Sequence, residues 1–182
     1  SSLEPIVKKY EDYEKVTKGI KESKEILADS QSDSELKKLA EEGETKLFVY
    51  ARSQDSKGPG KKQGLPFYNP AMELNRDLSI VVMQNFINSS KKPISALDGL
   101  ASSGIRGFRF LNELRGNVHV TVNDWEDHAY FLIKKNASNV HSENITIKQE
   151  NIHSLLSENK YDYIDIDPFG SPATYIDSGL RS

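Results

Sequence analysis

From residue 93 onward, short runs of apolar residues alternate with longer stretches in which apolar residues recur at helical spacing. The short runs are typical of buried strands, and the longer stretches are typical of amphipathic helices. Strands that alternate with helices along a chain form a parallel sheet with crossover helices, so we predict an α/β fold. The expected strands are 94–97, 118–122, 145–147 and 161–166, and the expected helices are 105–114, 126–139 and 152–157.

The fourth expected strand lies close to Ser182, the last residue. A complete doubly wound sheet has more strands than these four. We therefore expect the chain to hold the N-terminal half of such a sheet, and the natural sequence to continue beyond Ser182.

The first 42 residues are crowded with Lys and Glu. Their apolar residues recur every seven positions, at Ile6, Tyr13, Ile20 and Leu27. This pattern is typical of a helix that docks through a narrow seam. Turn and capping residues at 29–34 interrupt it, and a second short helix is expected at 35–42. We predict a helical hairpin in residues 1–42, with a possible helical partner along 3–42.

Residues 43–92 are expected to connect this hairpin to the sheet. Gly43 ends the second helix, 46–50 has the composition of a strand, and 53–64 has that of a flexible loop. A helix is expected at 75–87, from the spacing of Leu78, Val81, Val82 and Phe86. The predicted parts of the chain are therefore 1–42, 43–92 and 93–182.

Composition excludes several classes of protein. The chain has no cysteine, so it has no disulfide, cysteine-ligated zinc or thiolate nucleophile, and we expect no metal. Its net charge of -3 gives no argument for nucleic-acid binding from total charge. No apolar run approaches the roughly 20 residues of a membrane span, and the first residues do not resemble a signal peptide. We expect an intracellular protein, in a compartment that the sequence does not indicate.

Residues 98–107 (DGLASSGIRG) form a turn rich in small residues after the first expected strand of the sheet. Ligands of open parallel sheets bind beyond the carboxyl ends of the strands. Small residues let the backbone approach a ligand closely, and the next helix begins with free amides. We expect Asp98 and Gly104 to contact a cofactor, although a tight turn alone would also explain the glycines.

The second strand of the sheet ends in Asn123-Asp124. An acidic residue about 25 positions beyond a Gly-rich turn suits hydrogen bonds to the hydroxyls of a ribose. Asp124 also precedes a helix and has the side chain of an N-cap, and the two roles are compatible.

The fourth strand ends in Asp165-Ile166-Asp167-Pro168-Phe169. Methylation of an exocyclic amine needs groups that accept its N–H bonds, because its lone pair is delocalised into the ring. Asp167 and a carbonyl held by Pro168 would orient the amine, and Asp167 would take up its proton. Phe169 would stack on the base. We therefore predict Asp167, Pro168 and Phe169 as catalytic residues.

Four ordered motifs carry a resemblance to a known family. They are FYNP at 67–70 with NRD at 75–77, DGLASSGIRG at 98–107, Asn123-Asp124, and DIDPFGSP at 165–172. With them, residues 42–182 resemble the tRNA (guanine-26) N2-dimethyltransferases. The resemblance implies a Rossmann-like fold, S-adenosylmethionine as cofactor, tRNA as partner, and methylation of the N2 amine of a guanine.

The resemblance also implies residue roles. Arg76, Arg106 and Asp124 fall on cofactor-binding positions, and Asp167 falls on the catalytic position. Phe67 and Phe169 are expected to clamp the target guanine. Where the family has Asp-Ala after the third strand of the sheet, this chain has Asn151-Ile152. This pair is less typical of the family. Asn151 can still accept a bond from an adenine amino group, and Ile152 can pack on the ring.

Residues 3–42 resemble the N-terminal helical region of bacterial-type peptide chain release factors. This region is then a natural fusion, a misjoined gene or an engineered addition. The Gly-Gly-Gln motif of those factors is absent, so we expect no release activity.

Two other functions stay open at this point. One is an amino-methyltransferase that acts on adenine N6 or on glutamine, although such enzymes usually have Pro-Pro-Tyr or Pro-Pro-Phe after the acid. The other is a non-catalytic helical module joined to an incomplete and inactive methyltransferase domain.

Overall fold

The computed structural model describes residues 38–50, 66–138, 140, 142–168, 175 and 179–180. Contacts divide the chain into two units, 1–35 and 36–182, and every described residue belongs to the second unit. The predictions for residues 1–37, for the loop at 53–64 and for Phe169 lie outside the described residues.

The described part of the chain begins with a β-hairpin of strands β1 (Lys38–Glu42) and β2 (Thr45–Val49). The strands pair antiparallel, with Glu42 opposite Thr45 across a two-residue turn. Gly43 opens this turn with a φ of 56°, which glycine adopts without strain and which a type II′ turn needs at that position. The hairpin confirms the strand expected at 46–50.

The helix expected at 35–42 is wrong over β1. The sequence of β1 is rich in residues that favour helices, but the hairpin turn aligns it with β2. Its inward positions carry Ala40 and Glu42, which are buried, whereas Leu39 and Glu41 point outward. Because a glutamate occupies an inward position, β1 does not show the alternation of apolar and polar residues that is typical of a strand with one buried face.

Helix α2 (Glu73–Ser89) confirms the helix expected at 75–87 and follows the short 3-10 helix η1 (Pro70–Met72). The buried residues of α2 are Arg76 and Met83. The apolar residues that predicted the helix are instead exposed, namely Leu78, Val81, Val82 and Phe86. Their spacing predicted the helix but not the face that packs against the rest of the described residues.

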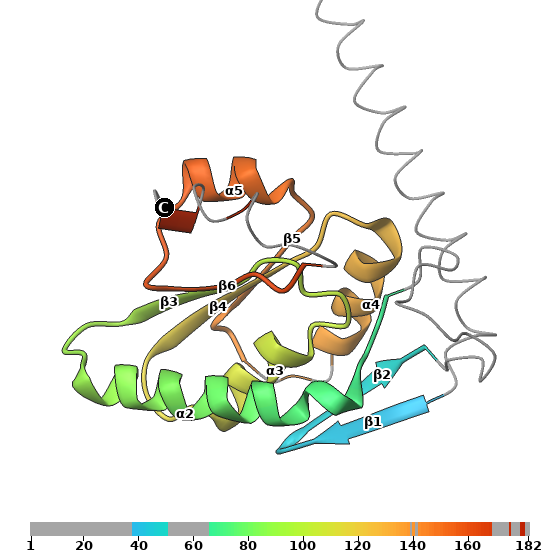
Figure 1. Ribbon diagram of the computed structural model, residues 1–182, viewed down its shortest axis with the longest axis horizontal. Helices are drawn as coiled ribbons and strands as arrows, with labels where there is room; N and C mark the ends of the chain where they lie inside the picture. Colours follow the sequence, from blue (N-terminus) through green and yellow to red (C-terminus); the bar gives the residue numbers. More distant parts are fainter. Residues whose placement is uncertain are drawn as a thin grey trace, which may run out of the picture. The chain divides into compact units, whose positions relative to one another are not determined.

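A parallel sheet of four strands forms the centre of the described structure (Figure 1). Its spatial order is β5 (Ile145–Lys148), β4 (Val118–Asn123), β3 (Ile94–Asp98) and β6 (Tyr163–Asp165). Each neighbouring pair runs parallel. The four strands therefore end at the same edge of the sheet, and the expected α/β fold is confirmed.

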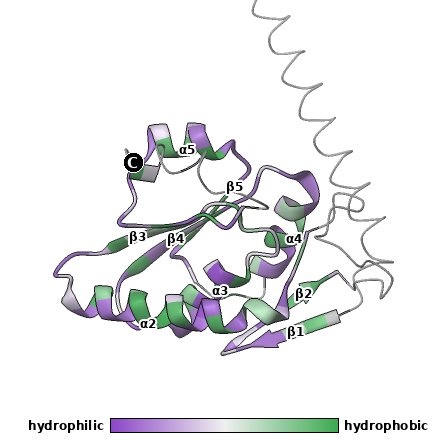
Figure 2. Ribbon diagram, in the orientation of Figure 1, coloured by the Kyte–Doolittle hydropathy of each residue, from purple (hydrophilic) through white to green (hydrophobic). Residues whose placement is uncertain are grey.

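Helices cover both faces of this sheet (Figure 1). Helices α2, α3 (Ile105–Glu113) and α4 (Asp127–Ala137) share one apolar cluster with Ile94 and Ala96 of β3. Helix α5 (Ile152–Glu158) packs with Leu97 on the other face. Neighbouring residues of a strand point to opposite faces, so β3 contributes to both clusters. Figure 2 shows hydrophobic residues on the central strands.

The other sheet elements match the predicted ones to within a few residues, although β6 is shorter than the run at 161–166. Among the helices of the described residues, none has the length and apolar character needed to cross a membrane.

The core predicts a contrast between two phenylalanines. Phe110 is fully buried and meets Tyr163 of β6 edge to face, whereas Phe86 on α2 is exposed. Phe110→Ala should lower the free energy of unfolding by about 3–5 kcal/mol, because it leaves a cavity in the core. Phe86→Ala should lower it by less than about 1 kcal/mol. Urea denaturation measures both, and equal losses would contradict this packing.

Candidate active site

A cavity of about 780 Å³ lies at the carboxyl edge of the sheet. Segments that follow all four strands line it, together with residues from 66–69 and the start of α2. The cavity brings together nine of the predicted site residues: Phe67, Arg76, Asp98, Arg106, Asp124, Asn151, Ile152, Asp167 and Pro168. Its volume is in the range of cavities that hold small molecules and cofactors.

The Gly-rich turn between β3 and α3 forms the floor of this cavity. Gly104 is the N-cap of α3 with a φ of 79°, and its amide donates to the carbonyl of Ala101 over 2.8 Å. Gly104 does not line the cavity, so in this structure it shapes the turn. Ser102 also has a positive φ, of 52°, which is uncommon outside glycine and is found at functional sites.

The side-chain amide of Asn123, at the end of β4, joins the ends of three strands. Its Nδ2 donates to the carbonyls of Gly99, after β3, and Glu150, after β5, and its Oδ1 accepts from the amide of Glu150. Asn123 is fully buried, and these bonds satisfy both ends of its amide. They hold the loops on either side of β4 at a set spacing.

Asp124 is held by backbone amides on both sides. Its Oδ2 accepts from the amide of Ser102 over 2.7 Å, and its Oδ1 accepts from the amide of Glu126 over 3.0 Å. Burial raises the pKa of Asp124, although these amides oppose the rise. Each carboxylate oxygen has two lone pairs, so both can accept a further bond from a ligand.

Asp98 ends β3 and accepts a hydrogen bond from the amide of Gly107 over 2.9 Å. Burial raises the pKa of Asp98 to about 7, and the nearby carboxylate of Asp165 adds to the rise. Arg106 opposes it. Asp98 therefore titrates near neutral pH in the folded chain.

Arg106 joins helix α2 to the end of β6. Its guanidinium donates to Asn75 and Ser79, while its Nε lies 3.1 Å from Asp165. Its Nη2 lies 3.9 Å from Oδ2 of Asp167, whose side chain is 60% exposed. Asp167 is thus beside a fixed positive charge while its carboxylate stays accessible from the cavity.

Phe67 is held against the Gly-rich turn by its backbone. Its amide donates to Oγ of Ser102 over 2.7 Å, and the same hydroxyl donates to the carbonyl of Phe67 over 2.9 Å. The segment at 66–69 therefore closes one side of the cavity through a contact between backbone and side chain.

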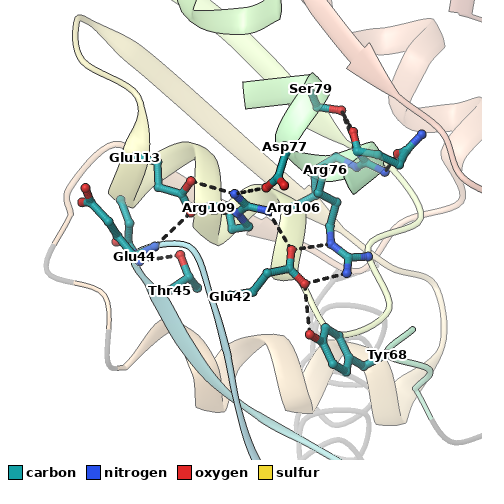
Figure 3. Close-up of polar contacts among 12 residues, drawn as sticks. Glu42, Glu44, Thr45, Tyr68, Arg76, Asp77, Ser79, Arg106, Arg109 and Glu113 are labelled. Carbon is teal, nitrogen blue, oxygen red and sulfur yellow. Dashed lines mark hydrogen bonds and ion pairs between the residues drawn. The ribbon is translucent and has the colours of Figure 1, made fainter. Parts of the chain in front are cut away.

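Arg76 lines the cavity and is anchored from behind by Glu42 of the hairpin (Figure 3). Its Nε and Nη2 each lie 2.6 Å from a carboxylate oxygen of Glu42. Nη2 also donates to the carbonyl of Asn69, and the guanidinium lies over the ring of Tyr68. The contact of Arg76 with a cofactor stays a prediction.

Sequence reasoning missed three residues that build this site, namely Glu42, Ser102 and Asp165. Glu42 lies in a run of charged residues, so its sequence does not indicate a strand. The signal for a hairpin was Gly43, which stands between the two five-residue segments 38–42 and 45–49. Asn151, which was expected to contact adenine, accepts a bond from the amide of His153 as the N-cap of α5.

Residues 43–182 match the family of N2,N2-dimethylguanosine tRNA methyltransferases. The chain belongs to this family. A tRNA (guanine(26)-N(2))-dimethyltransferase of Methanococcus maripaludis is 41% identical over 150 residues, which cover 80% of the chain and 39% of that relative. The enzyme of the same name from Sulfolobus acidocaldarius is 47% identical over 117 residues, or 64% of the chain and 29% of the relative. The chain therefore spans about two fifths, or less, of these family members.

Solved structures agree with this family and fold. Trm1 from Pyrococcus horikoshii, in complex with S-adenosyl-L-methionine, matches with a TM-score of 0.63 at 33% identity over 80% of this chain and 39% of that one. A SAM-dependent methyltransferase from Agrobacterium tumefaciens matches with a TM-score of 0.51 at 13% identity, over 70% of this chain and 38% of that one. The second likeness shows the fold alone. The Rossmann-like sheet and the family are confirmed, and the residue roles stay predictions.

Asp98 predicts how stability depends on pH. Its pKa is about 7 in the folded chain, above the ordinary aspartate value of 3.8 that applies in the unfolded chain, so the unfolded chain releases the proton first as pH rises. The free energy of unfolding should therefore fall as pH rises from about 4 to about 7. Asp98→Asn keeps an acceptor for Gly107 without the charge. It should be more stable than the natural chain by about 1–3 kcal/mol at pH 8, and by nothing at pH 4.

Asp162 is the matched control, because bonds from Ser95 and Lys92 lower its pKa. Asp162→Asn should therefore lose stability at pH 8 relative to the natural chain. Urea denaturation at the two pH values measures both variants, and a loss of stability at pH 8 in Asp98→Asn would contradict the burial of a neutral Asp98.

Proposed function

We propose that this chain carries the S-adenosylmethionine-binding and catalytic loops of a tRNA (guanine-N2)-methyltransferase that dimethylates guanine-26. One observation carries the proposal. The segments that follow the strands line a single cavity, with Ile152 after β5, Asp124 after β4, the Gly-rich turn after β3 and Asp167 after β6. The family match over 43–182 supports the substrate class.

The residues present suit the cofactor. Asp124 has free lone pairs for ribose hydroxyls, and Ile152 gives an apolar surface for a purine ring. The guanidinium of Arg76 lies at the cavity, where it can pair with the carboxylate of the cofactor's amino-acid end.

When bound, S-adenosylmethionine supplies an electrophilic methyl group. Asp167 then accepts an N–H bond from the guanine amine, orients its lone pair, and takes up the proton that the amine releases. Pro168 restricts the backbone so that the carbonyl beside it accepts the other N–H. Arg106, held by Asp165 over 3.1 Å, places a fixed positive charge 3.9 Å from the carboxylate of Asp167.

tRNA is the proposed partner, and Phe67 is the proposed clamp for the extruded guanine. Support comes from the position of Phe67 on the cavity wall, where Ser102 holds its backbone. We propose an intracellular location because the substrate is tRNA. The helical partner of residues 3–42 and their likeness to release factors stay predictions, since residues 3–37 lie outside the described residues and 38–42 form β1.

Two aspartates should separate binding from chemistry. Asp167→Ala should cut methyl transfer by about 10²- to 10⁴-fold, the usual contribution of a positioned acid or base, and leave the Kd of the cofactor unchanged. Asp124→Ala should weaken the Kd by about 10- to 100-fold, because it removes charge-assisted hydrogen bonds. Glu158→Ala, exposed at the end of α5, is the control for both.

Calorimetry with S-adenosylmethionine measures the Kd of this chain. Methyl transfer to a tRNA with guanine at position 26 is measured with a longer polypeptide that includes residues 1–182. Absence of cofactor binding by the natural chain would overturn the proposal, and unchanged transfer in Asp167→Ala would overturn the mechanism.

A further inference from the structure

The carboxylate of Glu42 is the meeting point of four separate parts of the chain (Figure 3). Its Oε1 accepts from Arg76 of α2 over 2.6 Å and from Arg109 of α3 over 2.8 Å. Its Oε2 accepts from Arg76 over 2.6 Å and from the hydroxyl of Tyr68 over 3.0 Å. The side chain of Glu42 has no exposed surface. A single carboxylate thus fixes the hairpin, the segment at 66–69 and two helices.

This carboxylate stays ionised inside the protein. Burial acts to raise the pKa of Glu42, but the hydrogen bonds from Arg76 and Arg109 outweigh it and hold the pKa below the usual value. Arg109 also pairs with Asp77 and Glu113, so Glu42 is not its only acidic partner. The negative charge of Glu42 is therefore available to hold Arg76.

The bonds of Arg76 use one side of its guanidinium. Nε and Nη2 face Glu42, and Nη2 also donates to the carbonyl of Asn69, whereas Nη1 takes part in none of these bonds. Arg76 nevertheless lines the cavity, with a side chain that is 6% exposed. Because the guanidinium is planar and rigid, hydrogen bonds along one of its edges also fix the direction in which the opposite edge points.

The order of the strands indicates which part of a cofactor Arg76 meets. If Ile152 after β5 takes the purine and Asp124 after β4 takes the ribose, the amino-acid end extends past the turn after β3. The segment at 66–69 and the start of α2 line the cavity next to that turn, through the bonds of Phe67 to Ser102. The group there that needs a cation is the carboxylate of the amino-acid end.

We propose that Glu42 is a positioning residue that aims Arg76 at the carboxylate of the cofactor's amino-acid end, an inference that rests on the proposed function. Glu42 touches neither the cofactor nor the substrate, because it does not line the cavity. It acts by fixing the orientation and the charge balance of the guanidinium. Glu42→Gln keeps the shape of the side chain but lets Arg76 turn and removes the ionic grip.

The test compares two ligands that differ at the amino-acid end. S-adenosylhomocysteine has the carboxylate, and 5′-methylthioadenosine has the same nucleoside and thioether without it. Calorimetry measures the Kd of each for the natural chain, for Glu42→Gln, and for the matched control Glu113→Gln. Glu113 bonds to Arg109 in the same network but not to Arg76.

Glu42→Gln should weaken the Kd of S-adenosylhomocysteine by about 10- to 100-fold, the usual effect of losing a charge-assisted hydrogen bond. It should leave the Kd of 5′-methylthioadenosine nearly unchanged. Glu113→Gln should change the two dissociation constants by the same small factor. A purely structural role of Glu42 would instead weaken both ligands in parallel in Glu42→Gln, which would overturn the proposal.

Glu42→Asp provides a second test in case Glu42→Gln does not fold. It keeps the negative charge that the two arginines need, but the side chain is shorter by one methylene. The ratio of the two dissociation constants should shift in the same direction as in Glu42→Gln, and an unchanged ratio overturns the proposal. Failure of the proposed function would look different, because the natural chain would then bind neither ligand.

Discussion

The amide of Asn123 sets the spacing on which the rest of the site depends. It bonds to the backbone after β3 and after β5 from its place at the end of β4, so it links three strand ends. Asp124 follows directly and bonds to the amide of Ser102 in the Gly-rich turn. Because the strands are parallel, the segments that follow them all begin at this edge, where they line the cavity together with residues 66–69 and the start of α2.

Two ion pairs then hold the arginines that line the cavity. Glu42 holds Arg76 behind the segment at 66–69 (Figure 3). Asp165 holds Arg106 at the end of β6. Both arginines are almost fully buried, and removal of either acid would leave a buried, unbalanced charge. The cost of burying these charges is offset by several hydrogen bonds to each guanidinium, which also set the direction in which it points.

Much of the fold was predictable because burial left its usual pattern in the sequence. The apolar residues of β3 and β4 are buried, so both strands stand out in the sequence as short segments rich in apolar residues, and the turns at 98–107 and 123–124 follow them directly. The hairpin was not predictable in the same way. Glu42 occupies an inward position of β1, and that burial makes sense only once Arg76 and Arg109 are brought to it from 34 and 67 residues away. In α2, likewise, the apolar spacing gave the helix, while its buried positions hold Arg76 and Met83.

The sequence by itself determined the alternation of strands and helices, the family, and the motifs that place Asp98, Asp124 and Asp167 at strand ends. These features are local, since each depends on residue types at short spacing. The tertiary structure alone decided that Glu42 lies in a strand, that its charge holds Arg76, and that Asp165 holds Arg106 beside Asp167. A buried ion pair has no periodicity and no fixed separation along the chain, so only the folded arrangement shows which charges meet.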